Sequence, residues 1–164
     1  MTAAAVGDTV YVVGGFVESG ATVRRVEAYD GAAGAWSVAP PLPIAANHAM
    51  SAGAGRRLVV AGGYRGPNLS NPTDRAFVFL DGRWRELPRM PETRAAGGAA
   101  VAAGRLYVVG GTVTGTGDLA RTTLVYTFAS GRWSTAPGLP TRREHLGVAA
   151  FGGKVYAVGG RTGG

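Results

Sequence analysis

The chain has 164 residues, 46% of them hydrophobic and 28 of them glycine, and its formal charge at pH 7 is +7. This composition is typical of a folded domain with many short strands and tight turns, and it excludes a disordered segment. Because cysteine is absent, disulfides, thiolate nucleophiles and cysteine-ligated metal sites are excluded as well. No run approaches the ~18 consecutive apolar residues of a membrane helix, and the first residues lack the basic segment of a signal peptide. We therefore expect no membrane partner and assign no cellular compartment.

One short pattern occurs four times along the chain: an apolar run that ends in a glycine doublet. The copies are TVYVVGG at 9–15, RLVVAGG at 57–63, RLYVVGG at 105–111 and KVYAVGG at 154–160. Successive doublets are 48, 48 and 49 residues apart. So constant a spacing predicts a repeat architecture, in which each unit buries its faces against a neighbouring copy.

Each complete unit holds four predicted strands. The first is rich in small apolar residues, and the second is the apolar run that ends in the glycine doublet, which we call the signature run. The third is rich in aromatic residues, and the fourth contains the tryptophan. In the first unit they lie at 2–6, 9–15, 26–29 and around Trp36. In the second they lie at 48–54, 57–63, 76–80 and around Trp84, and in the third at 95–102, 105–111, 124–128 and around Trp133. The fourth unit has only the first two strands, at 145–151 and 154–160. Short glycine-bearing turns join the strands as hairpins require, so each unit is predicted to be an antiparallel meander.

The signature run is apolar at consecutive positions, whereas a sheet with one face in water would show alternation. In a propeller both faces of a blade are covered by its neighbours, which accounts for the pattern. No segment shows a 3.6-residue apolar period over ten or more residues, so helices are not expected. The sequence thus predicts an all-β fold in which residues 1–164 form part of one propeller. Its blades are expected at 2–39, 47–87 and 95–136, with a half blade at 144–160.

The aligned units resemble the kelch repeat, in which a tyrosine precedes a glycine doublet by a few residues and a later aromatic residue and a tryptophan follow. The tyrosine is present in three units, and Val59 replaces it in the second. The resemblance covers almost the whole chain and implies a kelch-type β-propeller of four-stranded antiparallel blades, commonly six or seven of them. Three and a half units would form an incomplete ring. We therefore expect the segment to belong to a longer chain or to close by self-association with a second copy.

The long and irregular connections are expected at one end of the blades. In an antiparallel meander, the links between the second and third strands share an end with the links between successive units, and the tight hairpins lie at the other end. The irregular links are 16–23, 64–74 and 112–121. Irregular loops on a rigid scaffold are where binding usually resides, and the kelch resemblance implies a partner or small ligand at this loop face.

Candidate ligand-binding residues stand directly after the doublets and just before the first strands. They are Phe16, Tyr64, Arg65, Arg94, Thr112, Arg143, His145 and Arg161. In some kelch proteins the arginine at the position of Arg94 and Arg143 contacts an acidic ligand, so the resemblance slightly favours a protein or small anionic partner. The second unit departs here, because Ala46 takes the arginine's place. Two alternatives stay open: the two arginines brace neighbouring loops by hydrogen bonds, and the residues after the doublets serve only loop packing.

His48 and His145 occupy equivalent positions in the second and fourth units. Because facing sheets pack about 10 Å apart and a whole blade intervenes, we expect the two side chains to be too far apart to share a metal ion. No metal and no cofactor are predicted. His145 follows Arg143 and Glu144, which makes it a candidate general base; the alternative is an exposed histidine with ordinary hydrogen bonds.

The positive charge comes from 16 arginines and one lysine, many of which recur at equivalent turns. A nucleic-acid surface would concentrate them on one face among stacking aromatic residues, so we expect no nucleic-acid partner. Neither a hydrolase nor a Walker nor a zinc-protease motif is present. We interpret the chain as a binding module with no assigned catalytic residue. The alternatives are part of a kelch-class enzyme, such as a sugar-acid epimerase or mutarotase that uses arginine and histidine of the same face, and a purely structural role.

Overall fold

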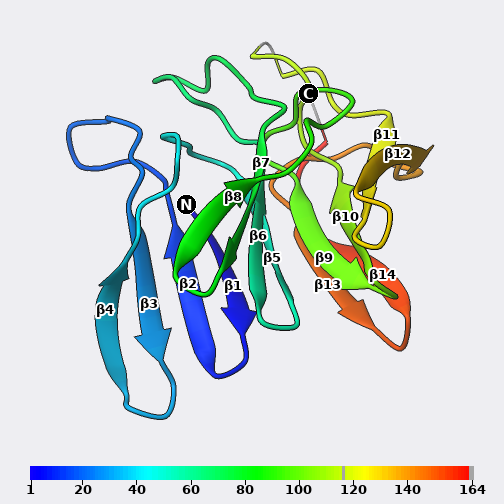
Figure 1. Ribbon diagram of the computed structural model, residues 1–164. Coiled ribbons are helices and arrows are strands. Elements are labelled where there is room, and N and C mark those ends of the chain that lie inside the picture. The colour runs from blue at the N-terminus through cyan, green and yellow to red at the C-terminus, as the bar shows by residue number, and fades with distance from the viewer. Residues whose placement is uncertain (116, 163–164) are drawn as a thin grey trace.

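The structure is a computed structural model that describes residues 1–115 and 117–162. Within these residues it contains strands and no helix (Figure 1). The first sheet consists of β1 (Thr2–Val6), β2 (Thr9–Val13), β3 (Val26–Asp30) and β4 (Ala35–Ala39), and the second of β5 (Met50–Ala54), β6 (Arg57–Ala61), β7 (Ala76–Leu80) and β8 (Arg83–Glu86). The third consists of β9 (Gly98–Ala102), β10 (Arg105–Val109), β11 (Thr122–Thr127) and β12 (Arg132–Pro137), and the fourth of β13 (Gly147–Phe151) and β14 (Lys154–Val158).

In every sheet the strands pair antiparallel and in chain order. The sheets stand side by side like blades, with β1, β5, β9 and β13 nearest one another (Figure 1). These four strands surround an open channel of about 440 Å³ lined mainly by alanine, with glycine, serine and valine. Small side chains on the first strands allow four sheets to converge on one axis. The prediction of an all-β, incomplete propeller is confirmed.

The hydrophobic core lies between the sheets and not on one side of them. On β6, Leu58 and Val60 pack toward the first sheet, where Val13 and Leu42 join them. The intervening Val59 packs in the opposite direction, toward the third sheet. All three β6 side chains are buried. Two-sided burial therefore explains why the signature run is apolar at consecutive positions.

The glycine doublet leaves room for a backbone carbonyl of the next unit. The second glycine of each of the first three doublets donates its N–H to a backbone carbonyl of the following unit, at 2.8–2.9 Å. The first glycine has positive φ and lies against the same carbonyl: a Cβ on Gly62 would stand 2.0 Å from the oxygen of Arg94. No side chain fits there. The first strands, predicted from residues 48, 95 and 145, start two or three residues later because His48, Ala96 and His145 have φ between 51° and 54°.

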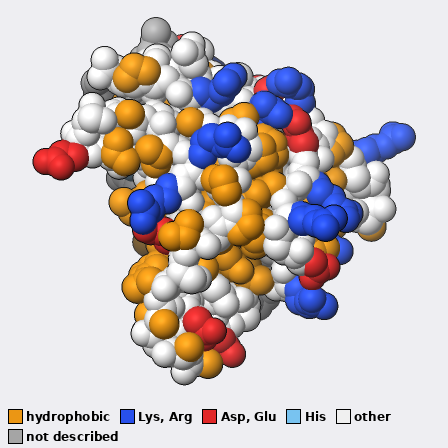
Figure 2. Space-filling view, turned by 60° about the vertical axis from the view of Figure 1, so that its left-hand side comes forward, with side chains coloured by type: hydrophobic (Ala, Val, Ile, Leu, Met, Phe, Trp, Pro, Cys, Tyr) orange, Lys and Arg blue, Asp and Glu red, His pale blue; other side chains and the backbone are white. Residues whose placement is uncertain are grey.

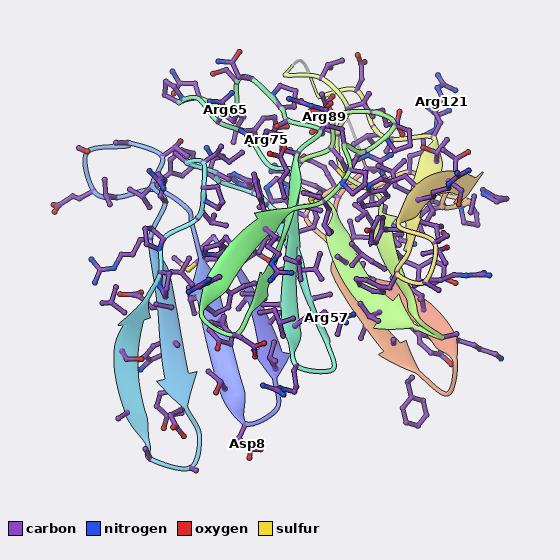
Figure 3. The ribbon with its side chains drawn as sticks, viewed as in Figure 1. Asp8, Arg57, Arg65, Arg75, Arg89 and Arg121 are labelled. Atoms are coloured by element: carbon purple, nitrogen blue, oxygen red, sulfur yellow. The ribbon has the colours of Figure 1, made fainter. Side chains whose placement is uncertain are left out.

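The long connections gather at one end of the molecule and the short hairpins at the other (Figure 1). Figure 3 shows Arg65 at the loop end and Asp8 at the hairpin end. Among residues 1–115 and 117–162 there is no helix long and apolar enough to cross a membrane.

Candidate functional site: the channel mouth

The residues after the doublets are held in place by paired backbone hydrogen bonds. Each exchanges two such bonds, of 2.8–3.0 Å, with the residue that stands three positions before the first strand of its own unit. The pairs are Tyr64 with Asn47, Thr112 with Ala95, and Arg161 with Glu144. This bridge sets the next residue of each unit, His48, Ala96 and His145, at one level around the loop end of the channel.

His48 and His145 meet at that level. Their ring centroids are 5.0 Å apart, with the ring planes at 80°. The expectation that an intervening blade would separate them is therefore wrong. The third unit contributes only Ala96 at the equivalent position, and its N–H donates to the carbonyl of His48 at 2.8 Å. The first strands converge on an axis, so the 10 Å spacing of parallel sheet faces does not apply to residues on the channel wall.

We call the following group the channel mouth: Phe16, His48, Tyr64, Thr112, Glu144, His145 and Arg161. The rings of Phe16 and Tyr64 contact His48 edge-on, with centroids 5.8 and 5.9 Å away. A pocket of about 280 Å³ opens between the two histidines. Its remaining lining comes from Met1, Thr2, Ala49, Ala96, Gly97 and Leu146.

The hydrogen bonds of Asn47 fix the proton on His48. Asn47 is fully buried, and its amide nitrogen donates to Thr22 Oγ1 at 2.8 Å and to the carbonyl of Gly66 at 3.2 Å. Its Oδ1 must then accept the 2.8 Å bond from Nδ1–H of His48. That leaves the lone pair on Nε2. Burial lowers the pKa of His48, and the nearby His145 lowers it further, so this ring is neutral at pH 7.

His145 lies beside two charged side chains, those of Glu144 and Arg161. Arg161 donates through Nε to Glu144 Oε1 at 2.6 Å, and Glu144 Oε2 lies 3.2 Å from His145 Nδ1. The Nη2 atom of Arg161 is 3.3 Å from the same ring nitrogen. Glu144 thus partly neutralises Arg161, and both side chains lie beside Nδ1 of His145, while the arginine side chain remains largely exposed.

Tyr64 and Thr112 are the buried members of the channel mouth. The Tyr64 hydroxyl lies 2.5 Å from Thr112 Oγ1, and Thr112 Oγ1 donates to the carbonyl of Ala95 at 3.4 Å. Neither residue contributes to the pocket between the histidines. Their hydroxyl groups are hydrogen-bonded to each other, which agrees with a role in loop packing.

The remaining candidates do not join this group. Arg94 is fully buried and donates to the carbonyls of Gly110 at 2.9 Å and Thr122 at 3.1 Å, and it also pairs with Glu92. Arg143 makes the equivalent bond to the carbonyl of Gly159 at 2.9 Å. Both arginines therefore brace the doublet of their own unit.

Arg65 lies exposed on the loop that follows the second doublet (Figure 3). Sequence reasoning had not selected His48, Asn47 or Glu144 as site residues. The signal for His48 was available, because it stands at the same position of its unit as His145. Among the described residues, no three histidine, cysteine, aspartate or glutamate side chains are grouped as a metal ion requires.

The sequence model of a family described as "Kelch motif" matches residues 1–43. The Kelch-like protein terF of Aspergillus terreus (strain NIH 2624 / FGSC A1156) is 34% identical over 107 residues, which cover 60% of this chain and 23% of that protein. The solved structure described as "Structure of YjhT" matches 99% of this chain with a TM-score of 0.81. These matches support a kelch-repeat family for this chain.

At 16% identity the YjhT likeness shows the propeller fold alone. The chain spans about a quarter of the length of terF and 62% of the YjhT chain.

Proposed function

We propose that this kelch segment is a binding module whose loop face takes an acidic ligand at the channel mouth. His48 and His145 line one pocket, and Arg161 lies beside His145 with its Nη2 atom 3.3 Å from Nδ1, which supports this proposal. A carboxylate at the channel mouth would accept hydrogen bonds from Arg161, from His145 and, when that ring is protonated, from Nε2–H of His48. Charge-assisted bonds of this kind are about twice as strong as neutral ones.

The pH dependence of binding follows from His48. Its pKa is lowered in the free protein, so a bound anion that favours the charged ring binds more tightly as the pH falls. A basic surface that merely attracts anions through its arginines would show no such change between pH 8 and pH 5.5.

The test is a titration with a fluorescein-labelled hexaglutamate peptide, followed by anisotropy at both pH values. His145→Ala and Arg161→Ala should each weaken binding about ten-fold, the loss of one charge-assisted hydrogen bond. Arg56→Ala is the matched control: it removes one positive charge, from a pair with Asp81 at the hairpin end, and should leave binding unchanged. Equal losses in all three variants would show non-specific attraction and refute the proposal.

One observation favours an enzyme as the second candidate. When Nδ1–H of His145 donates to Glu144 Oε2, 3.2 Å away, Nε2 keeps the lone pair that a general base needs. An epimerase acting on a sugar acid would exchange a carbon-bound proton with solvent. Deuterium incorporation into a sugar acid in D2O, abolished by His145→Gln, would support this role, and no incorporation would exclude it for that substrate.

A further inference from the structure

An arginine stands directly before the third strand of each complete unit: Arg25 before β3, Arg75 before β7 and Arg121 before β11. In the first two units a glutamate of the same sheet pairs with it. Arg25 donates through Nε to Glu27 Oε1 at 2.8 Å. Arg75 donates through Nε and Nη2 to the two carboxylate oxygens of Glu86, at 2.8 and 2.6 Å. The protein itself therefore balances the charge of these two arginines.

The third sheet lacks both glutamates. Thr123 stands in the place of Glu27. Its strand partner Ala136 stands in the place of Glu86. Arg121 is exposed at the loop end of this sheet (Figure 3), and it forms no ion pair with another described residue. No carboxylate of its own sheet balances the charge of Arg121.

Arg121 shares a pocket with a second arginine, Arg142. The pocket has a volume of about 390 Å³, and its other lining comes from Glu92, Val113, Asp118 and Leu119. Arg142 stands before β13 at the position that Thr93 has before β9. It is exposed and likewise forms no ion pair with any residue that the structure describes. We call this site the arginine pocket.

The two carboxylates of the arginine pocket are not paired with its arginines. Glu92 pairs with the buried Arg94 and accepts a hydrogen bond from the hydroxyl of Thr122, so its charge is already balanced. Asp118 accepts a hydrogen bond from Thr114 Oγ1 at 3.1 Å. Because the two oxygens of a carboxylate offer about four acceptor positions, both groups can accept further hydrogen bonds from hydroxyl groups of a ligand.

We infer that the arginine pocket binds a small hydroxylated phosphate monoester, such as a sugar phosphate. The forked donors of a guanidinium match the oxygens of a phosphate group. A phosphate monoester carries a charge of about −1.5 to −2 at pH 7, which the two arginines balance. Asp118 and Glu92 accept hydrogen bonds from the hydroxyl groups of the same ligand. The volume is within the range of small-molecule sites, roughly 300–1,000 Å³.

The arginine pocket is separate from the channel mouth, since the two have no residue in common. The inference therefore does not rest on the proposed acidic-ligand site. All residues that line the arginine pocket belong to the third unit and to the links on either side of it, between positions 92 and 142.

The test is isothermal titration calorimetry of the whole protein with glucose 6-phosphate at low ionic strength. We expect saturable binding that weakens at least ten-fold in Arg121→Gln and in Arg142→Gln. Ala136→Glu should weaken it as well, because it gives the third sheet the carboxylate that pairs with Arg75 in the second. Arg25→Gln is the matched control: it removes the equivalent arginine of the first unit and should leave the affinity unchanged.

Inorganic phosphate alone should bind at least ten-fold more weakly than glucose 6-phosphate, since it lacks the hydroxyl groups of the sugar. Equal affinities for the two, or no binding of glucose 6-phosphate, would overturn the inference. Equal losses in Arg25→Gln and Arg121→Gln would show non-specific attraction and would overturn it too. His145→Ala should leave this binding unchanged, and a loss in that variant would place the sugar phosphate at the channel mouth instead. Unchanged circular dichroism will show that the variants fold.

Discussion

The two inner junctions, between the first and second sheets and between the second and third, contrast with the outer sides of the first sheet and of β13–β14. At the inner junctions the indole N–H groups of Trp84 and Trp133 donate hydrogen bonds to the carbonyls of Pro40 and Pro88 in the preceding unit, and both side chains are partly buried. The equivalent Trp36, on the outer side of the first sheet, is 60% exposed. On the side of the molecule turned forward in Figure 2, hydrophobic side chains (orange) gather between positively charged ones (blue). The same motif residue thus stabilises the fold or lies bare, depending only on whether a neighbouring unit covers it.

The largest expected difference in stability between inner and outer positions is at the glycine doublets. Gly62 and Gly159 have nearly the same φ, 63° and 67°, but only Gly62 faces a carbonyl of the next unit, and Gly159 has nothing within 4 Å of an added Cβ. Gly159→Ala should lower the free energy of unfolding by about 1–2 kcal/mol, the left-handed penalty. Gly62→Ala should cost roughly 4–5 kcal/mol, because the clash adds to that penalty. Urea unfolding of both variants measures the difference, and equal losses would contradict it.

The second test compares the two bracing arginines. Arg94→Ala leaves the carbonyls of Gly110 and Thr122 without their buried donor, so we expect a loss of about 3 kcal/mol. Arg143→Ala removes the equivalent bond to Gly159 where solvent can replace it, and should cost less than ~1 kcal/mol. Thermal unfolding is the measurement. A larger loss for Arg143→Ala would mean that burial does not decide the strength of the brace.

Removing the indole hydrogen bond between units should have a smaller effect on stability. Trp84→Phe keeps much of the ring but loses the hydrogen bond to Pro40, and should destabilise the protein by about 1–2 kcal/mol. Trp36→Phe should change the unfolding free energy by no more than ~0.5 kcal/mol, since the side chain is exposed. Equal losses of unfolding free energy for the two substitutions would mean that the hydrogen bond from Trp84 to Pro40 does not stabilise the fold.

The smallest effect is a pH dependence of stability. The folded state lowers the pKa of His48, so the unfolded chain binds this proton more readily. Stability from the neutral ring is complete above the ordinary histidine pKa of about 6.5 and is lost as the pH falls through the lower folded value. His48→Gln should flatten this part of the stability curve. An unchanged slope between pH 7 and pH 5 in urea unfolding would refute the assignment.

The fold was largely predictable because its signals are periodic. Four doublets and three tryptophans define the units, and consecutive apolar residues on the signature run require cover on both faces. The channel mouth was less predictable, because its geometry depends on how far the first strands converge. That distance is set by alanine and glycine along the channel wall, and it brings His48 to His145 over an intervening unit.

The role of Arg94 could not be chosen from sequence either. An arginine before the first strand suits a ligand contact and a loop brace equally, and only its complete burial distinguishes them. The acceptors of the tryptophan indoles were also hidden, since each lies 44 or 45 residues away in the preceding unit.

The most direct test of the proposed acidic-ligand site is a nuclear magnetic resonance titration of the imidazole groups, since the chain has only two histidines. With hexaglutamate present, the resonances of His48 and His145 should shift together, and the pKa of His48 should rise toward its ordinary value as the anion favours the charged ring. Binding of the peptide that leaves both histidine signals and the pKa of His48 unchanged would place the ligand elsewhere and contradict the channel mouth as the site.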